Sequence, residues 1–400
     1  MPKLSIKDLD LRGKRVFIRV DFNVPLEDGR IGDDTRLRGS VPTIQHAAGA
    51  GSTVVLASHL GRPKGKRNPR FSLRPIVDRL GELLGRPVTF VEDCVGDDVR
   101  RTIDGVHVGG GGGVVLLENL RFHAEEEQNE PGFAAALAAL ADEYVNDAFG
   151  AAHRAHASVE AITRHFPRAA AGLLMEKELR YLGHALESPD RPFVAILGGA
   201  KVSDKIEVIE NLLGKIDRLL VGGAMAYTFL KSRGVATGGS LVEDDRLDEA
   251  RSIEAEAKKR NVRLELPVDH VVADRVDAGA AHEVLDVGDG RIGDRLGLDI
   301  GPATIGNYEG LLADARTVIW NGPMGVFEID AFAAGTNAVA RAVAKVKGAT
   351  IVGGGDSIAA LRKAGLADRI THISTGGGAS LEFLGGRTLP GVAALTDRAG

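Results

Sequence analysis

The chain has 400 residues, of which 44% are hydrophobic and 26% charged, enough to bury a substantial core and typical of two domains. Aromatic residues make up only 4% and the net charge is −5, a composition that argues against the aromatic platforms of single-strand nucleic-acid-binding proteins. The only cysteine, Cys94, excludes an intrachain disulfide and a cysteine-rich metal site; we interpret it as a small packed side chain. No apolar run approaches the ~20 residues of a membrane span, so we expect a cytoplasmic protein.

Short runs rich in Val, Ile and Leu alternate with longer amphipathic or Ala-rich stretches along the whole chain. Runs that are apolar throughout and separated by helices are typical of parallel strands covered on both faces. The predicted strands are 16–20, 53–57, 88–91, 114–117 and 144–145 in the first half, and 193–197, 218–221, 263–266, 317–320, 350–352 and 372–374 in the second. We therefore predict an α/β fold with a repeated βα unit in each half.

Basic and polar residues follow the predicted strands of the first half, and ligands bind at the carboxyl ends of the strands in such sheets. These turns contain Arg19, Asp21, Asn23, Arg36, His59, Arg62, Asn119, Arg121, His123, Asn146, Asp147, His153, Arg154 and His156. Guanidinium groups bind carboxylate and phosphate oxygens bidentately, so several converging arginines suit a small phosphorylated acid. Any one of them alone is better explained as a surface ion-pair partner.

Charge is unevenly distributed along the chain. Residues 1–75 hold fifteen Lys and Arg against seven Asp and Glu, a net charge of +8, which leaves −13 for the other 325 residues. A basic front on an acidic protein indicates a local anionic ligand rather than a nucleic-acid partner. The alternative is a solvated charged surface, which is weakened because the charges lie in loops rather than along a helix face.

The segment 173–186 repeats apolar positions at helical spacing, and Pro189 and Pro192 follow it. We predict an interdomain helix over 173–188. It would separate an N-terminal domain, residues 1–172, from a C-terminal domain, residues 189–386. The tail 387–400 is too short to form a domain and is expected to pack on the N-terminal one.

Four apolar runs in the second half end in paired or tripled glycine and then become helical, within 193–205, 219–230, 349–361 and 371–384. Glycine lets backbone N–H groups approach an oxyanion closely, and a following helix points its positive end at the same place. Lys201 and Lys205, four residues apart, are expected to share one helical face beside the first of these turns. The pattern predicts phosphate chemistry and a nucleotide polyphosphate.

Two carboxylates near these turns have two open interpretations each. Asp356 follows three glycines, and either holds Mg²⁺ or serves as the N-cap of the following helix. Glu328 ends a shaped loop, 320–328, and either reaches a ribose hydroxyl or remains a solvated carboxylate.

Several other motifs fail. A GxGxxG pattern at Gly288, Gly290 and Gly293 is not followed by a helix start, so we interpret it as a turn. Neither a GxxxxGK[ST] loop nor an HRD or DFG motif occurs. His153 and His156 lack further Cys or His neighbours in sequence, which argues against zinc.

The motifs VDFNVP, SHLGRPKG, LLENLRFHAEEE, VNDAFGAAHRAHAS, GGAKVSDK, GGAMAYTFL, WNGPMGVFE, VGGGDS and STGGGAS occur in this order. Together they resemble phosphoglycerate kinase over essentially the whole chain. The resemblance implies two Rossmann-like domains with parallel sheets, joined by an interdomain helix and hinge, in a monomeric enzyme. The implied reaction is reversible transfer of a phosphoryl group between Mg-ATP and the carboxylate of 3-phosphoglycerate.

The resemblance also implies roles for single residues. Its acid-substrate residues correspond to Asp21, Asn23, Arg36, His59, Arg62, Arg121 and Arg154. Its nucleotide residues correspond to Lys205, Gly297, Asn321, Glu328, Gly354, Gly355, Asp356 and Ser357, with Asp356 the metal-linked carboxylate. Its catalytic positions correspond to Arg36, Lys201, Lys205, Gly376 and Gly377.

Two alternatives to this function remain open from the residues. A different acyl-phosphate-forming kinase would share the glycine turns and lysines but would not need so many arginine-bearing loops. A non-catalytic nucleotide-binding scaffold would keep the core but could lose Lys201, Lys205 or Asp356, which are all present.

Overall fold

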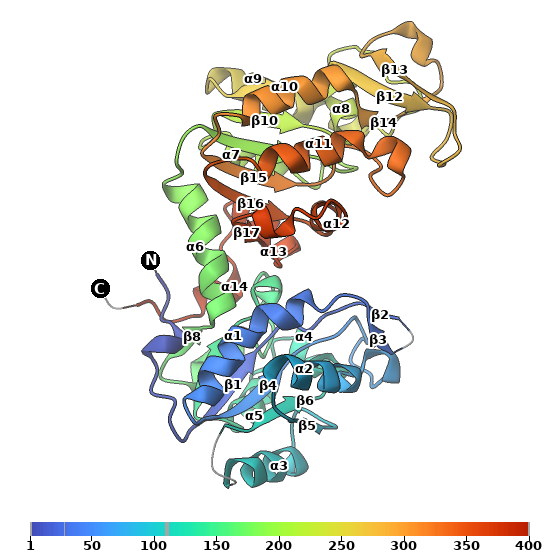
Figure 1. Cartoon of the computed structure of the whole chain (residues 1–400). Helices are drawn as coiled ribbons and strands as arrows, with labels where there is room; N and C mark the ends of the chain where they lie inside the picture. The colour runs from blue at the N-terminus through green and yellow to red at the C-terminus, as the bar shows by residue number, and fades with distance from the viewer. Residues whose placement is uncertain (1, 28, 109–111, 399–400) are drawn as a thin grey trace. The chain divides into compact units, whose positions relative to one another are not determined.

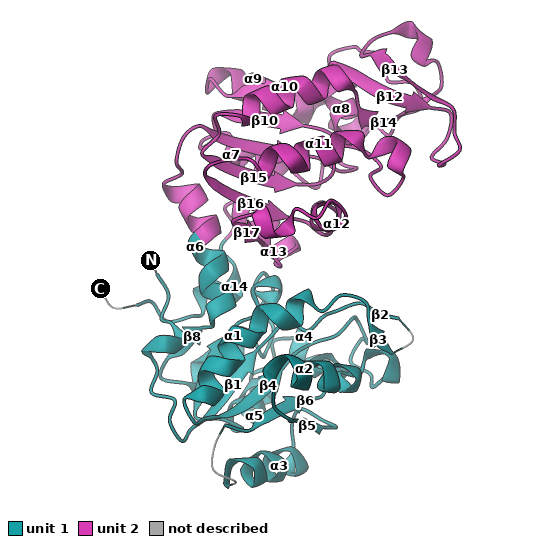
Figure 2. Cartoon of the chain, viewed as in Figure 1, with its two compact units in different colours: residues 1–180, 388–400 teal, residues 181–387 magenta. Residues whose placement is uncertain are grey.

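The computed structural model describes residues 2–27, 29–108 and 112–398. The chain divides into two compact units, residues 1–180 with 388–400 (unit 1) and residues 181–387 (unit 2), shown in Figure 2. The division falls inside helix α6, Leu173–Glu187. No helix of the described residues is long and apolar enough to cross a membrane.

Unit 1 is built on a six-stranded sheet in the order β5-β6-β4-β1-β7-β8, in which every pair is parallel. Its strands are β1 (Arg15–Arg19), β4 (Thr53–Ala57), β5 (Val88–Val91), β6 (Val114–Leu117), β7 (Glu143–Asn146) and β8 (Ala169–Ala171). The alanine strand β8 was not among the predicted strands, because a short alanine run has no β-branched signature. A two-stranded hairpin, β2 (Leu26–Glu27) and β3 (Arg30–Ile31), follows β1.

Helices cover this sheet because both faces of its central strands are apolar. Successive residues Val16, Phe17 and Ile18 on β1 are all completely buried, although they point to alternate faces. The α-helices that precede α6 in the chain are α1 (Thr35–Gly49), α2 (Val77–Leu84), α3 (Asp97–Val108), α4 (Ala124–Glu127) and α5 (Pro131–Ala138). One core packs Leu37 and Ile44 of α1 against the sheet.

The start of α6 is capped by a buried carboxylate from the loop after β7. Asp147 Oδ1 accepts hydrogen bonds from the backbone N–H groups of Leu174 at 2.9 Å and Met175 at 3.2 Å. Burial nevertheless raises the pKa of Asp147 to about 7. Asp147, one of the polar turn residues noted in the sequence, therefore positions a helix.

The C-terminal tail is hydrogen-bonded along unit 1. Its short helix α14, Pro390–Ala393, lies where Gly391 N donates to Ala152 O at 2.8 Å. Beyond it, Thr396 accepts from Leu4 N at 2.8 Å and donates to Ala169 O at 3.0 Å. Leu4 and Thr396, near the two ends of the described chain, thus both hydrogen-bond to β8 or to each other beside it.

Unit 2 contains a second six-stranded parallel sheet, in the order β11-β10-β9-β15-β16-β17. Its strands are β9 (Phe193–Leu197), β10 (Arg218–Val221), β11 (Arg263–Glu265), β15 (Thr317–Asn321), β16 (Ala349–Gly353) and β17 (His372–Ile373). Together the two sheets confirm the predicted α/β class with a parallel sheet in each half.

The helices of unit 2 cover both faces of this sheet. They are α7 (Ile206–Leu212), α8 (Met225–Ser232), α9 (Leu247–Lys259), α10 (Pro302–Leu312), α11 (Ala334–Val343), α12 (Gly355–Lys363) and α13 (Gly378–Leu384). One core joins α10, α11 and α12 to the strands through side chains such as Tyr308, Val339 and Leu361. Figure 1 shows α10 and α11 lying against this sheet. Alternate strand residues such as Ala195 and Ile319 are buried on the other face.

An antiparallel sheet that the sequence analysis missed projects from unit 2. It consists of β12 (Asp269–Ala273) between β13 (His282–Asp286) and β14 (Leu296–Ile300). Four of the five residues of β13 are exposed, so the segment lacks the apolar run by which the other strands were predicted. The GxGxxG segment lies between β13 and β14 and, as expected, opens no α-helix.

Candidate active site

The carboxyl ends of the central strands of unit 1 meet at one edge of the sheet. Arg19, the last residue of β1, is in register with Ala57 of β4 and with Asn146 of β7. The loops that follow these strands therefore start side by side. They carry the acid-substrate residues expected from the sequence.

Arg36, in the first turn of α1, is held by the loop after β1. Its Nη1 group donates to both carboxylate oxygens of Asp21, at 3.0 and 3.1 Å, and to the carbonyl of Asn23 at 3.2 Å. The Oδ1 atom of Asn23 accepts from Gly61 N at 2.9 Å, which ties in the loop after β4. The Asp21 side chain is 8% exposed and that of Arg36 31%, so the guanidinium remains partly open to solvent.

Arg121, from the loop after β6, joins the same group. Its Nη1 donates to the carbonyl of Gly61 at 2.8 Å, and its Nε lies 3.4 Å from a carboxylate oxygen of Glu127. Burial lowers the pKa of Arg121 to about 10, so it remains a cation at neutral pH. Arg62, next to Gly61, is exposed.

A buried charge network lies beneath these residues. Arg19 is completely buried, donates from Nε to Ser158 Oγ at 2.8 Å, and lies 3.9 Å from the carboxylate of Glu126. Glu126 in turn accepts from Ser158 N at 2.9 Å and Ser158 Oγ at 2.6 Å. Arg19 was noted only as a turn residue, and Glu126 only lies within the motif LLENLRFHAEEE, since nothing local in the sequence pairs them.

The contact with Arg19 determines the tautomer of His59. The Nη2 group of Arg19 lies 3.1 Å from His59 Nδ1, and because a guanidinium only donates, Nδ1 must accept. Burial and the charges of Arg19, Arg121 and Arg36 lower the pKa of His59 well below its usual value. His59 is therefore a neutral imidazole that carries its proton on Nε2.

The loop after β7 completes a positive cluster. Arg154 donates from Nε to His153 Nε2 at 3.1 Å. Burial, Arg121, Arg19 and Arg154 together lower the pKa of His156 to about 3. Arg154 thus acts electrostatically on the same group as Arg121, and an anion would relieve this mutual repulsion.

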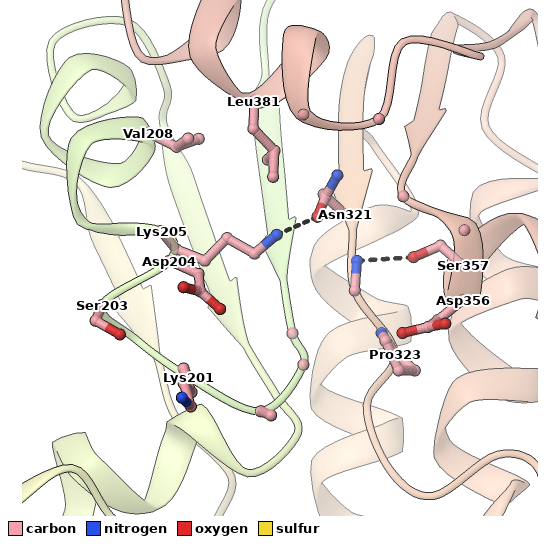
Figure 3. A pocket seen from close by; sticks show the side chains of 18 of the residues that line it. Lys201, Ser203, Asp204, Lys205, Val208, Asn321, Pro323, Asp356, Ser357 and Leu381 are labelled. Atoms are coloured by element: carbon pink, nitrogen blue, oxygen red, sulfur yellow. Dashed lines mark hydrogen bonds between the residues drawn. The ribbon is translucent and has the colours of Figure 1, made fainter. Parts of the chain in front are cut away.

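Three of the four predicted glycine turns of unit 2 line a cavity of about 740 Å³ (Figure 3). The expected nucleotide and catalytic residues in its wall are Lys201, Lys205, Asn321, Gly354, Gly355, Asp356, Ser357 and Gly377. They come from the carboxyl ends of β9, β15, β16 and β17 and from the turns and the helix start that follow these strands. Four separate strand ends therefore contribute to one cavity, whereas the remaining glycine turn, within 219–230, contributes Gly223 to a second cavity described below.

The two lysines do not share a helical face, contrary to the prediction. Helix α7 begins only at Ile206, and both Lys201 and Lys205 lie in the turn before it, because the chain leaves β9 through Gly199 at φ +104°. Lys205 is 8% exposed and donates to Asn321 Oδ1, whereas Lys201 is exposed at the other end of the turn (Figure 3). Burial lowers the pKa of Lys205 to about 8, opposed by the charges of Asp204 and Asp356.

Asp356 is not the N-cap of α12. Gly354, at φ +88°, takes the N-cap position, and Asp356 is the second residue of the helix. Within the described parts of the chain, no hydrogen bond or ion pair engages its exposed carboxylate. Ser357 is buried instead, and its Oγ accepts from Gly322 N at 2.7 Å, which fixes the loop after β15.

A second, more apolar cavity of about 400 Å³ adjoins the first, since Gly199, Ala200, Pro323 and Asp356 line both. Gly297 and Glu328 are in its wall, with Leu298 and Met324. A side chain at Gly297 would place its Cβ 1.6 Å from the Tyr227 hydroxyl, so only glycine leaves this surface open.

Three further residues of this wall were missed by the sequence analysis: Tyr227, His270 and Asp299. Asp299 accepts from Gly335 N at 2.7 Å, and burial raises its pKa to about 7. Tyr227 Oη and His270 Nδ1 lie 3.0 Å apart. His270 and Asp299 lie on β12 and β14, whose pairing the sequence did not reveal, whereas Tyr227 lies on α8.

Gly376 and Gly377 differ in position. Gly377, at φ +52°, is the N-cap of α13 and lines the first cavity. Gly376 is buried, and its N–H donates to Ser374 Oγ at 3.3 Å. Gly377 is thus the one of the pair that faces the cavity.

Comparison with known proteins decides the family. The model of the phosphoglycerate kinase family matches residues 6–387. The chain belongs to the phosphoglycerate kinase family. It is 57% identical over 406 residues to the phosphoglycerate kinase of Koribacter versatilis and 59% identical over 407 residues to that of Acidobacterium capsulatum, with full coverage of both proteins in each case.

Solved structures of the family share the fold. The phosphoglycerate kinase of Coxiella burnetii has 43% sequence identity and a TM-score of 0.89, and that of Pyrococcus horikoshii has 35% and 0.82. Both comparisons cover 98% of each chain. Membership in the phosphoglycerate kinase family confirms the expected enzyme class, an ATP-dependent kinase of glycolysis that acts on 3-phosphoglycerate. It argues against the two alternatives, a different acyl-phosphate-forming kinase and a non-catalytic nucleotide-binding scaffold.

Proposed function

We propose that this enzyme transfers the γ-phosphoryl group of ATP directly and in line to the carboxylate of 3-phosphoglycerate, giving 1,3-bisphosphoglycerate and ADP. The observation that carries the proposal is the different chemistry of the two units, an arginine and histidine cluster in unit 1 and a glycine and lysine cavity in unit 2. A carboxylate is already ionised at neutral pH, so the reaction needs no general base. Catalysis then rests on positioning and charge neutralisation.

Unit 1 would bind the acid. Arg36, Arg62, Arg121 and Arg154 supply cationic donors for its phosphate and carboxylate oxygens. His59 adds a neutral Nε2–H donor. Asp21 and Asn23 support these donors. Asp21 orients Arg36, and Asn23 joins the loop after β1 to the loop after β4.

Unit 2 would bind the nucleotide. Lys205 and the backbone amides around Gly354, Gly355 and Ser357 suit the polyphosphate, because α12 begins there with its positive end toward the cavity. Asn321 would orient Lys205. The more apolar cavity beside Gly297 suits the base, with Glu328 available for a ribose hydroxyl.

Asp356 would hold Mg²⁺. Its exposed carboxylate borders both cavities and makes no hydrogen bond or ion pair to any described residue, so its oxygens are available to a hard cation. When bound with the nucleotide, Mg²⁺ would neutralise negative charge on the phosphate oxygens. Asp356 would be the carboxylate that the protein contributes to it.

Transfer would require the two units to close about a hinge, since the acid and nucleotide residues belong to different units. Closure would bring Arg36, Lys201 and the turn at Gly376 and Gly377 onto the moving phosphoryl group, where the cations neutralise charge on its equatorial oxygens. Helix α6 is the proposed hinge element, because the division between the units falls inside it. We expect the protein to be cytoplasmic and monomeric. Light scattering on the purified chain tests the monomeric state.

A coupled assay of ADP formation tests the reaction. Turnover should require both Mg-ATP and 3-phosphoglycerate, and ATP turnover independent of the acid would contradict the proposal. With a chiral γ-phosphoryl group, a single in-line transfer inverts the configuration at phosphorus. Retention of configuration would exclude direct transfer.

Two variants test the division of roles. Arg154→Ala should raise the KM for 3-phosphoglycerate and leave the Kd for ADP unchanged. Lys201→Ala should lower kcat by about 100-fold or more, as loss of a transition-state donor does, and still bind nucleotide. A mainly nucleotide-side defect in Arg154→Ala, or near-normal kcat in Lys201→Ala, would overturn these assignments.

A further inference from the structure

We propose that unit 1 contains a binding site for a thiophilic divalent cation of the Zn²⁺ class, formed by Asp93, Cys94 and His123. One carboxylate oxygen, the thiol sulfur and one ring nitrogen of these residues all lie within 4.8 Å of one another. Carboxylate, thiolate and imidazole are the three side-chain ligands that Zn²⁺ takes in proteins. None of the three residues belongs to the acid or nucleotide sites described above.

The fold brings these residues together from two neighbouring strands. Asp93 and Cys94 follow β5, and His123 follows β6 after a 3₁₀ turn, Leu120–Phe122. Because β5 and β6 are adjacent and parallel, their carboxyl ends lie side by side. Cys94 and His123 are far apart in the chain, so their proximity is set by strand pairing.

The imidazole is already oriented toward the other ligands. His123 Nε2 lies 2.7 Å from Asp93 Oδ1, and the ring stacks on Phe133 with a centroid distance of 5.2 Å. A cation that binds here would displace the Nε2 proton to solvent, and Nε2 and Oδ1 would each become a ligand. These two atoms, now in hydrogen-bond contact, would have to separate to admit it.

The three proposed ligands differ in their exposure to solvent. Cys94 is 1% exposed, whereas the side chains of His123 and Asp93 are 29% and 49% exposed. A cation can thus enter from the solvent side past the carboxylate and reach the buried sulfur. On binding, the sulfur–proton bond breaks, a sulfur–metal bond forms and the proton passes to solvent. Three protein ligands leave one tetrahedral position for water.

The surroundings of the thiol carry the charge that suits a cation. The carboxylates of Asp93, Glu126 and Glu118 all act electrostatically on the Cys94 thiol. Their negative potential attracts a divalent ion. A simple ion pair between Asp93 and His123 is the competing explanation, and it predicts no involvement of the sulfur.

Titration of the nucleotide-free, full-length chain with Co²⁺ tests the site. Cys94 is the only cysteine, so a thiolate-to-cobalt charge-transfer band can come from no other residue. We expect this band to saturate at one equivalent and to vanish when Zn²⁺ is added. It should be absent in Cys94→Ala.

Two further variants separate a built site from a lone thiol. Asp93→Asn and His123→Gln should each raise the Kd for Co²⁺, measured from the charge-transfer band, by at least about tenfold. Loss of a residue that only hydrogen-bonds to a metal ligand already costs that much. Asp97→Asn, an exposed neighbour outside the site, should leave it unchanged. Circular dichroism checks the fold of each variant.

The proposal is overturned if wild-type protein shows no charge-transfer band at saturating Co²⁺. It is also overturned if the band keeps the same Co²⁺ affinity in Asp93→Asn and His123→Gln, because the sulfur would then bind alone. Both of these side chains are partly exposed, so the two variants test the site even where Cys94→Ala fails to fold.

Discussion

Arg19 Nη2 and His59 Nδ1 lie 3.1 Å apart, and both side chains are buried. Because the guanidinium has no acceptor, this contact determines the tautomer of the imidazole. Arg19 is in turn anchored by Ser158 and Glu126. The tautomer of a histidine in the proposed acid site is therefore determined by a buried arginine in direct contact with it.

This relationship predicts the NMR behaviour of His59. In ¹⁵N-labelled protein without ligand, its ring should be neutral with the proton on Nε2, and should not titrate near pH 6.5, because burial and neighbouring arginines lower its pKa. Observation of an Nδ1-bound proton, or of titration near the ordinary pKa, would contradict the assignment.

Glu126→Gln should strongly destabilise unit 1. The carboxylate is completely buried, and its loss leaves the charge of Arg19 without its partner, which costs about 3–5 kcal/mol. Glu125 is exposed, so Glu125→Gln should change the free energy of unfolding by less than about 0.5 kcal/mol. Urea unfolding measures both, and equal midpoints would show that the network contributes little.

Nucleotide affinity should depend on the proton of Lys205. Its pKa of about 8 lies below the ordinary lysine value, so the free enzyme loses this cation as the pH rises from 7 to 9. The Kd for ADP should therefore increase over that range. In Lys205→Arg the charge persists to high pH, so its profile should be flatter. Calorimetric titrations at several pH values measure the Kd for ADP of the wild type and of Lys205→Arg. If the Kd of both proteins changes with pH in the same way, deprotonation of Lys205 is not the cause.

Asp356→Asn should affect Mg²⁺ use rather than folding. The exposed side chain makes no helix-capping hydrogen bond, so the free energy of unfolding should change by less than about 0.5 kcal/mol. The Mg²⁺ concentration needed for half-maximal activity should rise, because the proposed protein ligand loses its charge. Asp368→Asn, an exposed carboxylate outside the cavities, serves as control. An unchanged Mg²⁺ requirement would refute the role.

The sequence by itself determined the two parallel sheets. Strands such as 53–57 and 193–197 are buried on both faces, so an uninterrupted apolar run marks them regardless of what packs against them. The glycine turns are equally local, because a backbone close to an anion or at positive φ requires glycine at that position. These features, with the ordered motifs, were sufficient for the family.

Only the tertiary structure decided how the side chains pair. Lys201 and Lys205 seemed to share a helix face until α7 was seen to start after them, a boundary set by how the turn packs. Arg19 meets Glu126 and His59 because spatial strand order differs from chain order, which places β1 between β4 and β7. Such contacts join residues far apart in sequence, and no local pattern encodes them.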